Sequence, residues 1–513
     1  MRRASSRAGL VSDPELIVRA IEAFLARAQA ALLVAAGEPA YRVLPEQCEI
    51  ARRGSVLWWE VWDGDRCWRR RLAGYTVEPG GVVRLLVHRL GGQVEHVILI
   101  DAADPRHHYW LGRSRRHNFA NTFKRFLCRQ FPGWNLERFS AEADLARSLS
   151  PLFPRALLRR GSSFWAAVAA PPLGPQSVDV LAYALIWLDH LRRELNVSKV
   201  DLVLFLPRGC EHGTSLRLRW LNLGSSRLRL FVYDQEGAER EIDPNDWGNL
   251  QTKLEPWLEI HHVQFADDPA CAALIRLPFV ECVPLPGRCL SFRIRGLEVA
   301  RWDDGHLEWQ LQVLREAASV GWPTIVQRLC ELERLRSPDS HDLRHPYYLQ
   351  QPERWLESEV RKQLTVIDPR LCSEPVYGQV PQIAGLDRAV LDLLAIEHSG
   401  RLVVLELKAT EDVQLPLQAL DYWARVRHHL LTGDFERFGY FRGRTIRRVS
   451  PRLIFVAPCL QFHPTTELLL GYFSEEVPVE RVGVNMNWRE GLQVVFRATG
   501  AKPPAASSFQ APV

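Results

Sequence analysis

Hydrophobic and polar positions recur with two periods along the chain, and together these periods predict an α/β protein. Apolar residues recur at helical spacing over residues 13–34, and residues 41–101 alternate as strands do, which predicts a helix followed by a small antiparallel sheet. A second helix is expected over residues 117–131, followed by a helix-rich region to about residue 196. The apolar run at 178–191 contains acidic residues and therefore predicts a buried helix and no membrane span.

The middle of the chain carries shorter patterns. Residues 201–207 predict a buried strand, and residues 215–234 alternate as a hairpin whose turn is formed by residues 224–226. Mixed strands and one final helix are expected over about 255–335. The polar, proline-bracketed segment 337–346 that follows is the predicted domain boundary.

The hydrophobic pattern is sharpest after residue 346. It predicts a helix that begins near Pro352, a short strand, a β-hairpin, a helix that begins near Pro416, and then a strand, a helix and two strands. This order implies a mixed sheet with helices on both faces. The predicted ranges are 352–364, 374–380, 388–409, 415–431, 452–458, 465–473, 479–484 and 492–497.

The predicted fold class is therefore α/β, with a C-terminal mixed sheet flanked by helices and, before it, an α+β region of unassigned fold. Residues 1–115 are expected to form a helix with an antiparallel sheet, and residues 116–335 an α+β region of unknown role. Residues 346–499 form the C-terminal domain, and the Pro/Ala/Ser-rich tail at 500–513 is predicted to be disordered.

Composition and charge narrow the function only slightly. A hydrophobic content of 47% is ample for packed cores, and the first residues lack the apolar segment of a secretory signal. The ten cysteines form no CxxC pair, so buried free thiols in a reducing cytoplasm are expected. A net charge of +5 permits nucleic-acid binding without demanding it.

The second strand of the predicted hairpin is apolar and then ends in two charged residues, Glu406 and Lys408. A three-residue loop ending at Gly400, with this glycine in the left-handed conformation, would place Asp392 directly opposite Glu406, and Lys408 on the same face. A two-residue loop would instead place Asp392 and Glu406 on opposite faces. The register of the hairpin is thus a prediction that a structure can test.

Two carboxylates that face each other in the middle of a sheet repel, and a divalent cation between them removes the repulsion. Oxygen ligands with room for water suit Mg²⁺ or Mn²⁺. Lys408 is one of only six lysines in the chain, and its compact charge can hold a water and neutralise a phosphate. The alternative is a simple buried ion pair between Lys408 and either Glu406 or Asp392.

Asp392, the tripeptide Glu406-Leu407-Lys408 and a following helix with Gln418 and Tyr422 together resemble the PD-(D/E)XK nuclease superfamily. The resemblance covers residues 346–499 and implies the restriction-endonuclease-like fold, which tRNA-endonuclease-like domains share. The hairpin is most similar to that of mismatch and branched-DNA endonucleases, and the Gln418/Tyr422 spacing is similar to the QxxxY element of RecB-like members. One departure is that no proline precedes Asp392.

The resemblance implies a role for each matching residue. Asp392 and Glu406 would be metal ligands, with the Leu407 carbonyl as a third, and Lys408 would be the catalytic lysine. Gln418 would orient the catalytic residues or contact the substrate, and Tyr422 would lie one turn later on the same face. An additional acid on the first helix of this domain would be Glu357, with Glu353 and Glu359 left open.

The implied activity is hydrolysis of phosphodiester bonds by a Mg²⁺- or Mn²⁺-dependent endonuclease, with DNA favoured as the substrate. The alternatives are an RNA endonuclease and a module of the same fold that binds nucleic acid or a protein without cleaving. The oligomeric state is left open, a homodimer included. Four arginines, Arg442, Arg444, Arg447 and Arg448, are expected either to grip a phosphate backbone or to lie in a solvated loop.

Other residues are weaker candidates for contacts with nucleic acid or a metal ion. The arginine clusters at 69–71 and 113–116 are further candidates for contacts with phosphates, and Trp58, Trp59 and Trp62 either stack bases or lie in the core, which the strand spacing favours. The histidine pairs at 107–108, 261–262 and 428–429 show no third ligand, so metal sites are not expected there.

Overall fold

The computed structural model describes residues 10–500 apart from short gaps at 36–39, 54–55, 64–65, 79, 89–93, 173–179, 235–236, 247–251, 258–267, 287–288, 304 and 385–386. Side chains at 53, 66, 108–111, 113–114, 379, 381–384 and 387–390 are also outside the description, as are His261, His262 and most of the predicted tail. By their contacts the residues divide into two compact units, Met1–Ala143 with Ser150–Arg160, and Asp144–Leu149 with Gly161–Val513. The molecule is a mixed α/β protein with several sheets.

The first unit begins with the predicted helix and antiparallel sheet. Helix α1 (Pro14–Arg27) is capped by Asp13, whose carboxylate accepts hydrogen bonds from the backbone N–H groups of Glu15 and Leu16. The sheet has the order β2-β1-β7-β6-β5-β4-β3, and all its pairs are antiparallel. Its strands are β1 (Ala31–Ala35), β2 (Tyr41–Arg42), β3 (Cys48–Arg53), β4 (Val56–Asp63), β5 (Arg66–Val77), β6 (Val83–His88) and β7 (Val94–Asp101).

The helix predicted over 13–34 is wrong in its second half, because residues 31–35 form strand β1. Asp101, at the end of β7, accepts hydrogen bonds from the backbone N–H groups of Gln29 and Ala30 and so holds the chain extended before β1. Pairing with β7 then outweighs the helical spacing of the apolar residues.

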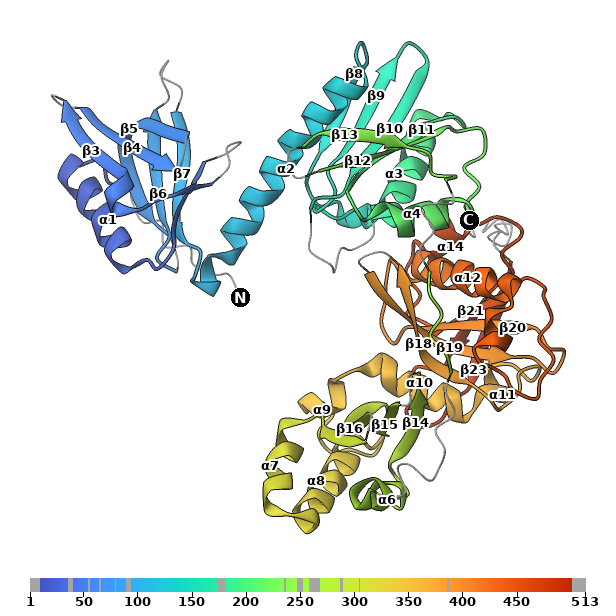
Figure 1. Cartoon of the computed structure of the whole chain (residues 1–513). Helices are drawn as coiled ribbons and strands as arrows, with labels where there is room; N and C mark the ends of the chain where they lie inside the picture. The colour runs from blue at the N-terminus through green and yellow to red at the C-terminus, as the bar shows by residue number, and fades with distance from the viewer. Residues whose placement is uncertain are drawn as a thin grey trace, which may run out of the picture. The chain divides into compact units, whose positions relative to one another are not determined.

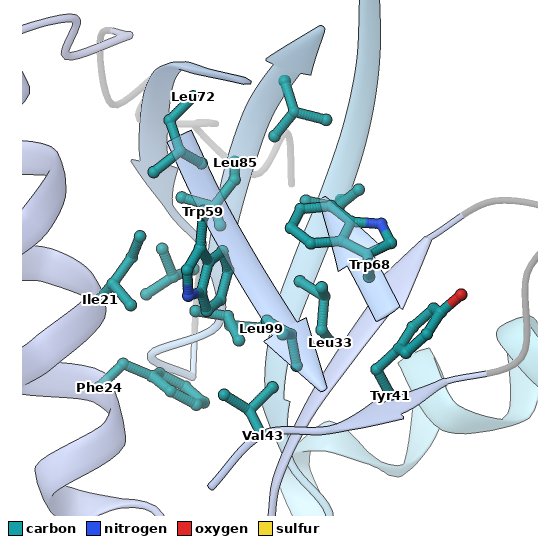
Figure 2. Close-up of a cluster of buried hydrophobic side chains, with 14 of the residues drawn as sticks. Ile21, Phe24, Leu33, Tyr41, Val43, Trp59, Trp68, Leu72, Leu85 and Leu99 are labelled. Atoms are coloured by element: carbon teal, nitrogen blue, oxygen red, sulfur yellow. The ribbon is translucent and has the colours of Figure 1, made fainter. Parts of the chain in front are cut away.

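Side chains of α1 and of the facing sheet form one core, which Figure 2 shows in close-up. Trp59 and Trp68 lie fully buried in this core, with ring centroids 5.6 Å apart and rings nearly perpendicular. Trp58 and Trp62 alternate with Trp59 along β4 and point to the other face, where Trp62 is 37% exposed. Of the three tryptophans, Trp59 therefore lies in the core, as the strand spacing predicted.

The region after the sheet corrects the predicted helix-rich segment. Helix α2 (His108–Gln130) begins earlier than predicted and is followed by strands β8 (Asn135–Ser140) and β9 (Arg155–Arg160), which pair with each other. Strand β10 (Ser163–Ala169) then opens the second unit, so helix resumes only at α3 (Val180–Leu195). Helix α3 confirms the predicted buried apolar helix.

The first part of the second unit is built around parallel strands. Strands β10, β11 (Asp201–Pro207) and β12 (Leu228–Tyr233) are parallel, and β13 (Glu239–Ile242) is antiparallel to β12. Strand β11 confirms the prediction, but the hairpin over 215–234 is wrong. Its first residues belong to helix α4 (Glu211–Leu218), in which Arg217 Nε donates a hydrogen bond to the Gly213 carbonyl.

A four-stranded antiparallel meander follows. One helix precedes it in the sequence and two helices come after it. Its strands are β14 (Glu281–Leu285), β15 (Cys289–Ile294), β16 (Leu297–Asp303) and β17 (His306–Trp309), and α6 (Pro269–Ile275) precedes them. The single helix predicted to end near 335 is two helices, α7 (Gln312–Val320) and α8 (Trp322–Leu335). Gly321, with φ of 137°, breaks it, and Pro323 starts the second helix.

The C-terminal part confirms the predicted order of elements (Figure 1). After α9 (Pro346–Leu349), its sheet has the order β18-β19-β20-β21-β22-β23, in which β20, β21 and β22 are mutually parallel and the other pairs antiparallel. The strands are β18 (Tyr377–Ala384), β19 (Asp387–Ile396), β20 (Leu402–Leu407), β21 (Arg452–Pro458), β22 (Val479–Val484) and β23 (Val494–Thr499). The helices are α10 (Pro352–Lys362), α11 (Leu364–Ile367), α12 (Leu415–Thr432), α13 (Asp434–Arg437) and α14 (Thr466–Leu470).

Helices cover both faces of this sheet. Helices α10 and α11 pack on the face formed by alternate residues such as Leu393, Val403 and Leu405. Helix α12 contacts β20 and β21 without sharing that core, so it covers the face that carries Leu394 and Val404. The hairpin β19–β20 therefore lies in the interior of the sheet, as predicted.

Two further expectations concern the whole chain. All ten cysteines are free thiols, as predicted, but only Cys271, Cys289 and Cys372 are buried, whereas Cys67, Cys128 and Cys282 are exposed. Among the described residues, no helix combines the length and the apolar character that crossing a membrane requires.

Candidate active site

The hairpin β19–β20 has the predicted register. The Gly400 N–H donates to the Glu397 carbonyl at 2.9 Å, and the Glu397 N–H donates to the Arg401 carbonyl at 2.8 Å. The pairs then run from Ile396 with Leu402 to Leu393 with Leu405, and the next position places Asp392 opposite Glu406. Gly400 has φ of 85°, which confirms the left-handed turn.

Asp392 and Glu406 form a carboxylate pair with few compensating contacts. Asp392 accepts a hydrogen bond from the Leu407 N–H at 3.0 Å, whereas Glu406 is 1% exposed and its Oε2 atom has no hydrogen-bond partner in the described part of the chain. Burial, together with the charge of Glu357, raises the pKa of Asp392 to about 6. Burial and the charge of Asp392 raise the pKa of Glu406 well above its ordinary value.

Lys408 lies beside this pair, just beyond the end of β20. Its Nζ atom is 4.0 Å from Glu406 Oε1 and 3.3 Å from Asp412 Oδ2. Its backbone N–H donates to the Val456 carbonyl at 3.0 Å, which fixes the side chain at the edge of the strand. Burial opposes the ammonium ion, but the nearby carboxylates prevail and raise the pKa of Lys408. The lysine is therefore positively charged at neutral pH.

Helix α12 places Gln418 and Tyr422 on the side of the sheet that carries the carboxylate pair. Gln418 Nε2 donates to the Tyr422 hydroxyl oxygen at 3.0 Å, across one turn of the helix. Burial raises the pKa of Tyr422, and the charge of Glu406 raises it further. Tyr422 is thus a neutral phenol close to the carboxylate pair, and Gln418 holds its hydroxyl group.

Among the three candidate acids on α10, Glu357 is the one that points toward the site. It is 1% exposed, and its charge contributes to the raised pKa of Asp392. Its carboxylate contacts three guanidinium groups, at 2.6 Å from Arg354, 3.3 Å from Arg361 and 3.4 Å from Arg293. Burial favours the neutral acid, but these charges outweigh burial and lower the pKa of Glu357.

The other two acids lie elsewhere on the helix surface. Glu359 pairs with Lys362 at 3.4 Å, and Glu353 lies in the first turn, where an acid is favourable to the helix dipole.

The structure does not bring the arginines of residues 442–448 to this site. The four side chains are exposed in the loop before β21, and the Arg447 N–H donates to the Gly400 carbonyl at 2.8 Å. Gly400 is the turn of the hairpin, so about 20 Å of extended strand separates it from Glu406. The loop and the carboxylate pair therefore lie at opposite ends of β20.

Two of the N-terminal candidates, Arg69 and His107, already have partners of their own. Arg69 pairs with Glu60 at 2.9 Å and lies over the Trp58 ring at 5.0 Å. His107 lies in a loop contact, where its ring nitrogens are within 3.2 Å of the backbone of Asp101 and Gly80. The side chain of Arg113 lies outside the described residues.

A metal ion would have to be held by few protein ligands. Among the described residues, no group of three or more His, Cys, Asp or Glu side chains is arranged to hold a metal. The pair Asp392 and Glu406 still fits Mg²⁺, because this ion commonly uses one or two carboxylates and fills its other positions with water and substrate phosphate. The buried, unpartnered Glu406 Oε2 is the atom in this structure that such an ion would satisfy.

Sequence reasoning missed four residues of this cluster, one of which, Arg361, follows Glu357 by four residues on α10 and pairs with it. Asp412 follows Lys408 by four residues, but in a loop, where this spacing predicts no contact. Arg354 precedes Glu357 by three residues on α10, a helical spacing that could have identified the pair. Arg293 comes from β15, and nothing in the sequence indicates that it contacts Glu357.

Comparison with known proteins gives no independent assignment. No family model matches the sequence, and no curated protein is significantly similar to it. The function is therefore inferred from the geometry of the site.

Proposed function

We propose that the chain is a metal-dependent nuclease that hydrolyses phosphodiester bonds, and that residues 346–499 form a restriction-endonuclease-like domain. The observation that carries the proposal is the carboxylate pair in the interior of a sheet, Asp392 opposite Glu406, with Lys408 beside it. A pair of this kind, with Glu406 buried and Asp392 half-buried, opposes the stability of the fold unless a cation and a substrate use it. The order and pairing of the surrounding strands support the same fold.

Asp392 and Glu406, with the Leu407 carbonyl, would hold the metal ion. When bound, Mg²⁺ would supply Lewis-acid stabilisation of the phosphate. Lys408 is charged and therefore serves as a donor: its ammonium group orients the attacking water and neutralises the charge that develops on the phosphate. Gln418 and Tyr422 present neutral donors from α12 that position these groups or contact the substrate.

DNA is the favoured substrate of the proposed enzyme, and RNA is the competing one. The test incubates the purified chain with plasmid, linear, single-stranded and branched DNA and with RNA, in Mg²⁺, Mn²⁺ or chelator. Metal-dependent cleavage is expected, and Lys408→Ala should lower its rate by roughly 100-fold or more, because it removes a charged donor from the reacting phosphate. Lys199→Ala, which removes an exposed lysine before β11, is the matched control.

Equal cleavage by the wild type and Lys408→Ala would overturn the assignment of the site. Tight binding of nucleic acid without cleavage in any metal would instead indicate a non-cleaving module of the same fold.

A further inference from the structure

The middle of the chain repeats the order and direction of the elements that carry the candidate site. Strands β10, β11 and β12 are parallel, β13 pairs antiparallel with β12, and helices α3 and α4 connect the three parallel strands. The C-terminal sheet has the same arrangement in β20, β21, β22 and β23, with α12 and α14 in the corresponding connections. Residues 163–242, the first scaffold, therefore repeat the topology of residues 402–499, the second scaffold.

The two scaffolds also agree in register. The middle strands β11 and β21 each have seven residues and end at a proline. Their first residues, Asp201 and Arg452, pair with Trp165 of β10 and Val403 of β20, respectively. The second residue of each middle strand pairs with the first residue of the next strand, β12 or β22. The register thus gives each position of β20 a counterpart in β10.

This register identifies the counterparts of two site residues. Glu406 pairs with the fourth residue of β21, and Val168 pairs with the fourth residue of β11. The Lys408 N–H donates to the carbonyl of the fifth residue of β21 at 3.0 Å, and the Ala170 N–H donates to that of the fifth residue of β11 at 2.9 Å. Val168 and Ala170 thus occupy the positions of Glu406 and Lys408. Alkyl side chains neither bind Mg²⁺ nor carry charge, so the first scaffold lacks this part of the site.

The two scaffolds contact each other through corresponding elements. Helix α12 packs against α4, and α3, its counterpart, packs against α14, the counterpart of α4. Arg427, the thirteenth residue of α12, lies over the ring of Trp220 at 4.6 Å, and Arg192, the thirteenth residue of α3, lies over the ring of Tyr472 at 5.7 Å. Trp220 and Tyr472 each follow the end of their helix, α4 or α14, by two residues. Such reciprocal contacts are those that a twofold axis produces.

The backbone at this contact obeys the same relation. Leu221 and Phe473, each three residues after the end of α4 or α14, form an antiparallel bridge with each other. The Asn222 N–H donates to the carbonyl of the residue before Phe473 at 2.6 Å, and the Ser474 N–H donates to the carbonyl of the residue before Leu221 at 2.8 Å. Corresponding groups thus exchange corresponding hydrogen bonds. A pseudo-twofold axis that passes between Leu221 and Phe473 therefore relates the two scaffolds.

On the basis of the nuclease function proposed above, we infer that the first scaffold is an inactive copy of the second, and that this pseudo-twofold pair binds duplex DNA and cuts one strand in each binding event. The two strands of a duplex are themselves related by twofold axes, so a twofold pair of like domains matches a duplex. A pair with two complete sites would reach both strands, whereas a pair with one complete site reaches one. Each event consumes one water, breaks one P–O bond and leaves a phosphate and a hydroxyl group at the nick.

The first experiment follows the cleavage of supercoiled plasmid, in excess over the full chain, in Mg²⁺. Open circles should accumulate first, and linear DNA should appear only after a lag, when independent nicks on opposite strands lie close together. Linear DNA that forms from the start, as fast as supercoiled plasmid disappears, would overturn the inference and leave the nuclease function intact. Cleavage of single-stranded DNA without cleavage of duplex would have the same meaning.

The second experiment compares substitutions at matched positions of the two scaffolds. Lys408→Ala should lower the nicking rate by roughly 100-fold or more, because it removes a charged donor from the reacting phosphate. Ala170→Ser should nick at the rate of the wild type, since the side chain at this position takes no part in the reaction. Loss of nicking in Ala170→Ser, in protein that melts as the wild type does, would show that the first scaffold takes part in the chemistry and would overturn the inference.

The third measurement is the stoichiometry of the complex with a short duplex in Ca²⁺, by sedimentation. One chain per duplex is expected, because the first scaffold takes the place of a second chain. Two chains that together cut both strands would overturn the inference alone. A folded wild type that cuts neither duplex nor single strands in Mg²⁺ or Mn²⁺ would overturn the nuclease function and the inference together.

Discussion

At the scale of single residues, the carboxylate pair opposes the stability of the fold. Asp392 and Glu406 face each other, and burial raises the pKa of each because the charged form is disfavoured. Lys408 compensates only in part, since its Nζ lies 4.0 Å from one Glu406 oxygen and leaves the other without a partner. The pair is thus a local instability retained at the candidate site.

Asp392→Asn should stabilise the protein in chelator by roughly 1–3 kcal/mol, because the amide keeps an acceptor for the Leu407 N–H and removes the charge facing Glu406. Thermal melts should also show that Mg²⁺ raises the Tm of the wild type but not of this variant. Asp303→Asn, at an exposed position at the end of β16, provides the control. If Asp392→Asn had a lower Tm than the wild type in chelator, Asp392 and Glu406 would not be repelling each other in the folded protein.

A second residue-scale prediction concerns His429 on α12. Its Nδ1 lies 2.8 Å from Asp434 and its Nε2 lies 3.0 Å from the Thr252 hydroxyl group, which suits a neutral ring that donates to the first and accepts from the second. Burial lowers the pKa of His429, with His428 and Arg425 adding to this effect and Asp434 opposing it. The unfolded chain therefore takes up a proton at a higher pH than the folded protein does.

Stability should consequently fall as the pH drops below about 6.5, the ordinary pKa of histidine, and recover above it. Urea titrations from about pH 5 to 7.5 on the wild type and His429→Gln test this, and the variant should show a shallower dependence. Exposed His341, replaced by Gln, serves as the control. Identical slopes in the wild type and His429→Gln would assign the dependence to other groups.

At the scale of elements, the turn of the hairpin sets the register that creates the site. Gly400 has a positive φ, and a Cβ at this position would overlap the Thr445 carbonyl oxygen. Gly443 also has a positive φ, of 76°, but a Cβ there would meet nothing within 4 Å. The two glycines thus separate the cost of the backbone conformation from the cost of the overlap.

Gly400→Ala should lower the free energy of unfolding by roughly 2–4 kcal/mol, because it adds steric overlap to the left-handed strain. Gly443→Ala should cost about 1 kcal/mol, since only the left-handed strain applies. Urea denaturation followed by tryptophan fluorescence compares the two. Equal losses would mean that the turn tolerates a side chain and does not fix the register.

The elements that the sequence predicted well are those whose pattern and pairing are local. Strands β19 and β20 are consecutive in the sequence and pair with each other around a glycine turn. Helix α12 has clear periodicity, a proline near its start and a glycine at its end. Strand β1 was mistaken because Asp101 and the pairing with β7 decide its conformation, and helix α4 was mistaken because its apolar residues alternate as in a strand. Apolar spacing alone does not carry that information.

The candidate site divides in the same way. Asp392, Glu406 and Lys408 belong to one hairpin, so their convergence followed from a single register. Arg293 is 64 positions from Glu357, and only the folded chain brings them together. The charge environment of the predicted helix acid was therefore beyond the reach of sequence patterns.

At the scale of the molecule, the C-terminal sheet depends on residues that precede it. Trp220 stacks edge-on against Trp423 with centroids 4.9 Å apart, and Arg293 reaches Glu357. Trp257 contacts Tyr377 at 4.4 Å, and its N–H donates to the Phe438 carbonyl. Residues 346–499 are thus a predicted domain whose surface is partly covered by residues 161–345.

A fragment of residues 346–513 should consequently be less stable than one of residues 161–513. The shorter fragment loses aromatic contacts and leaves Glu357 with one cation fewer, so its Tm should be lower by roughly 10 °C or more. Circular dichroism melts of the two fragments make the comparison. A shared Tm would show that the earlier residues add nothing to the stability of the sheet.

The position of Arg293 has a consequence for synthesis on the ribosome. Chains fold from the N-terminus as they emerge, and β15 leaves the ribosome before α10 does. When Glu357 leaves the ribosome, Arg293 in the already translated meander can pair with it. Glu406 and Lys408 are translated later still. The two carboxylates of the candidate site therefore converge only late in synthesis, so a ribosome that stalls early releases no fragment that contains both of them.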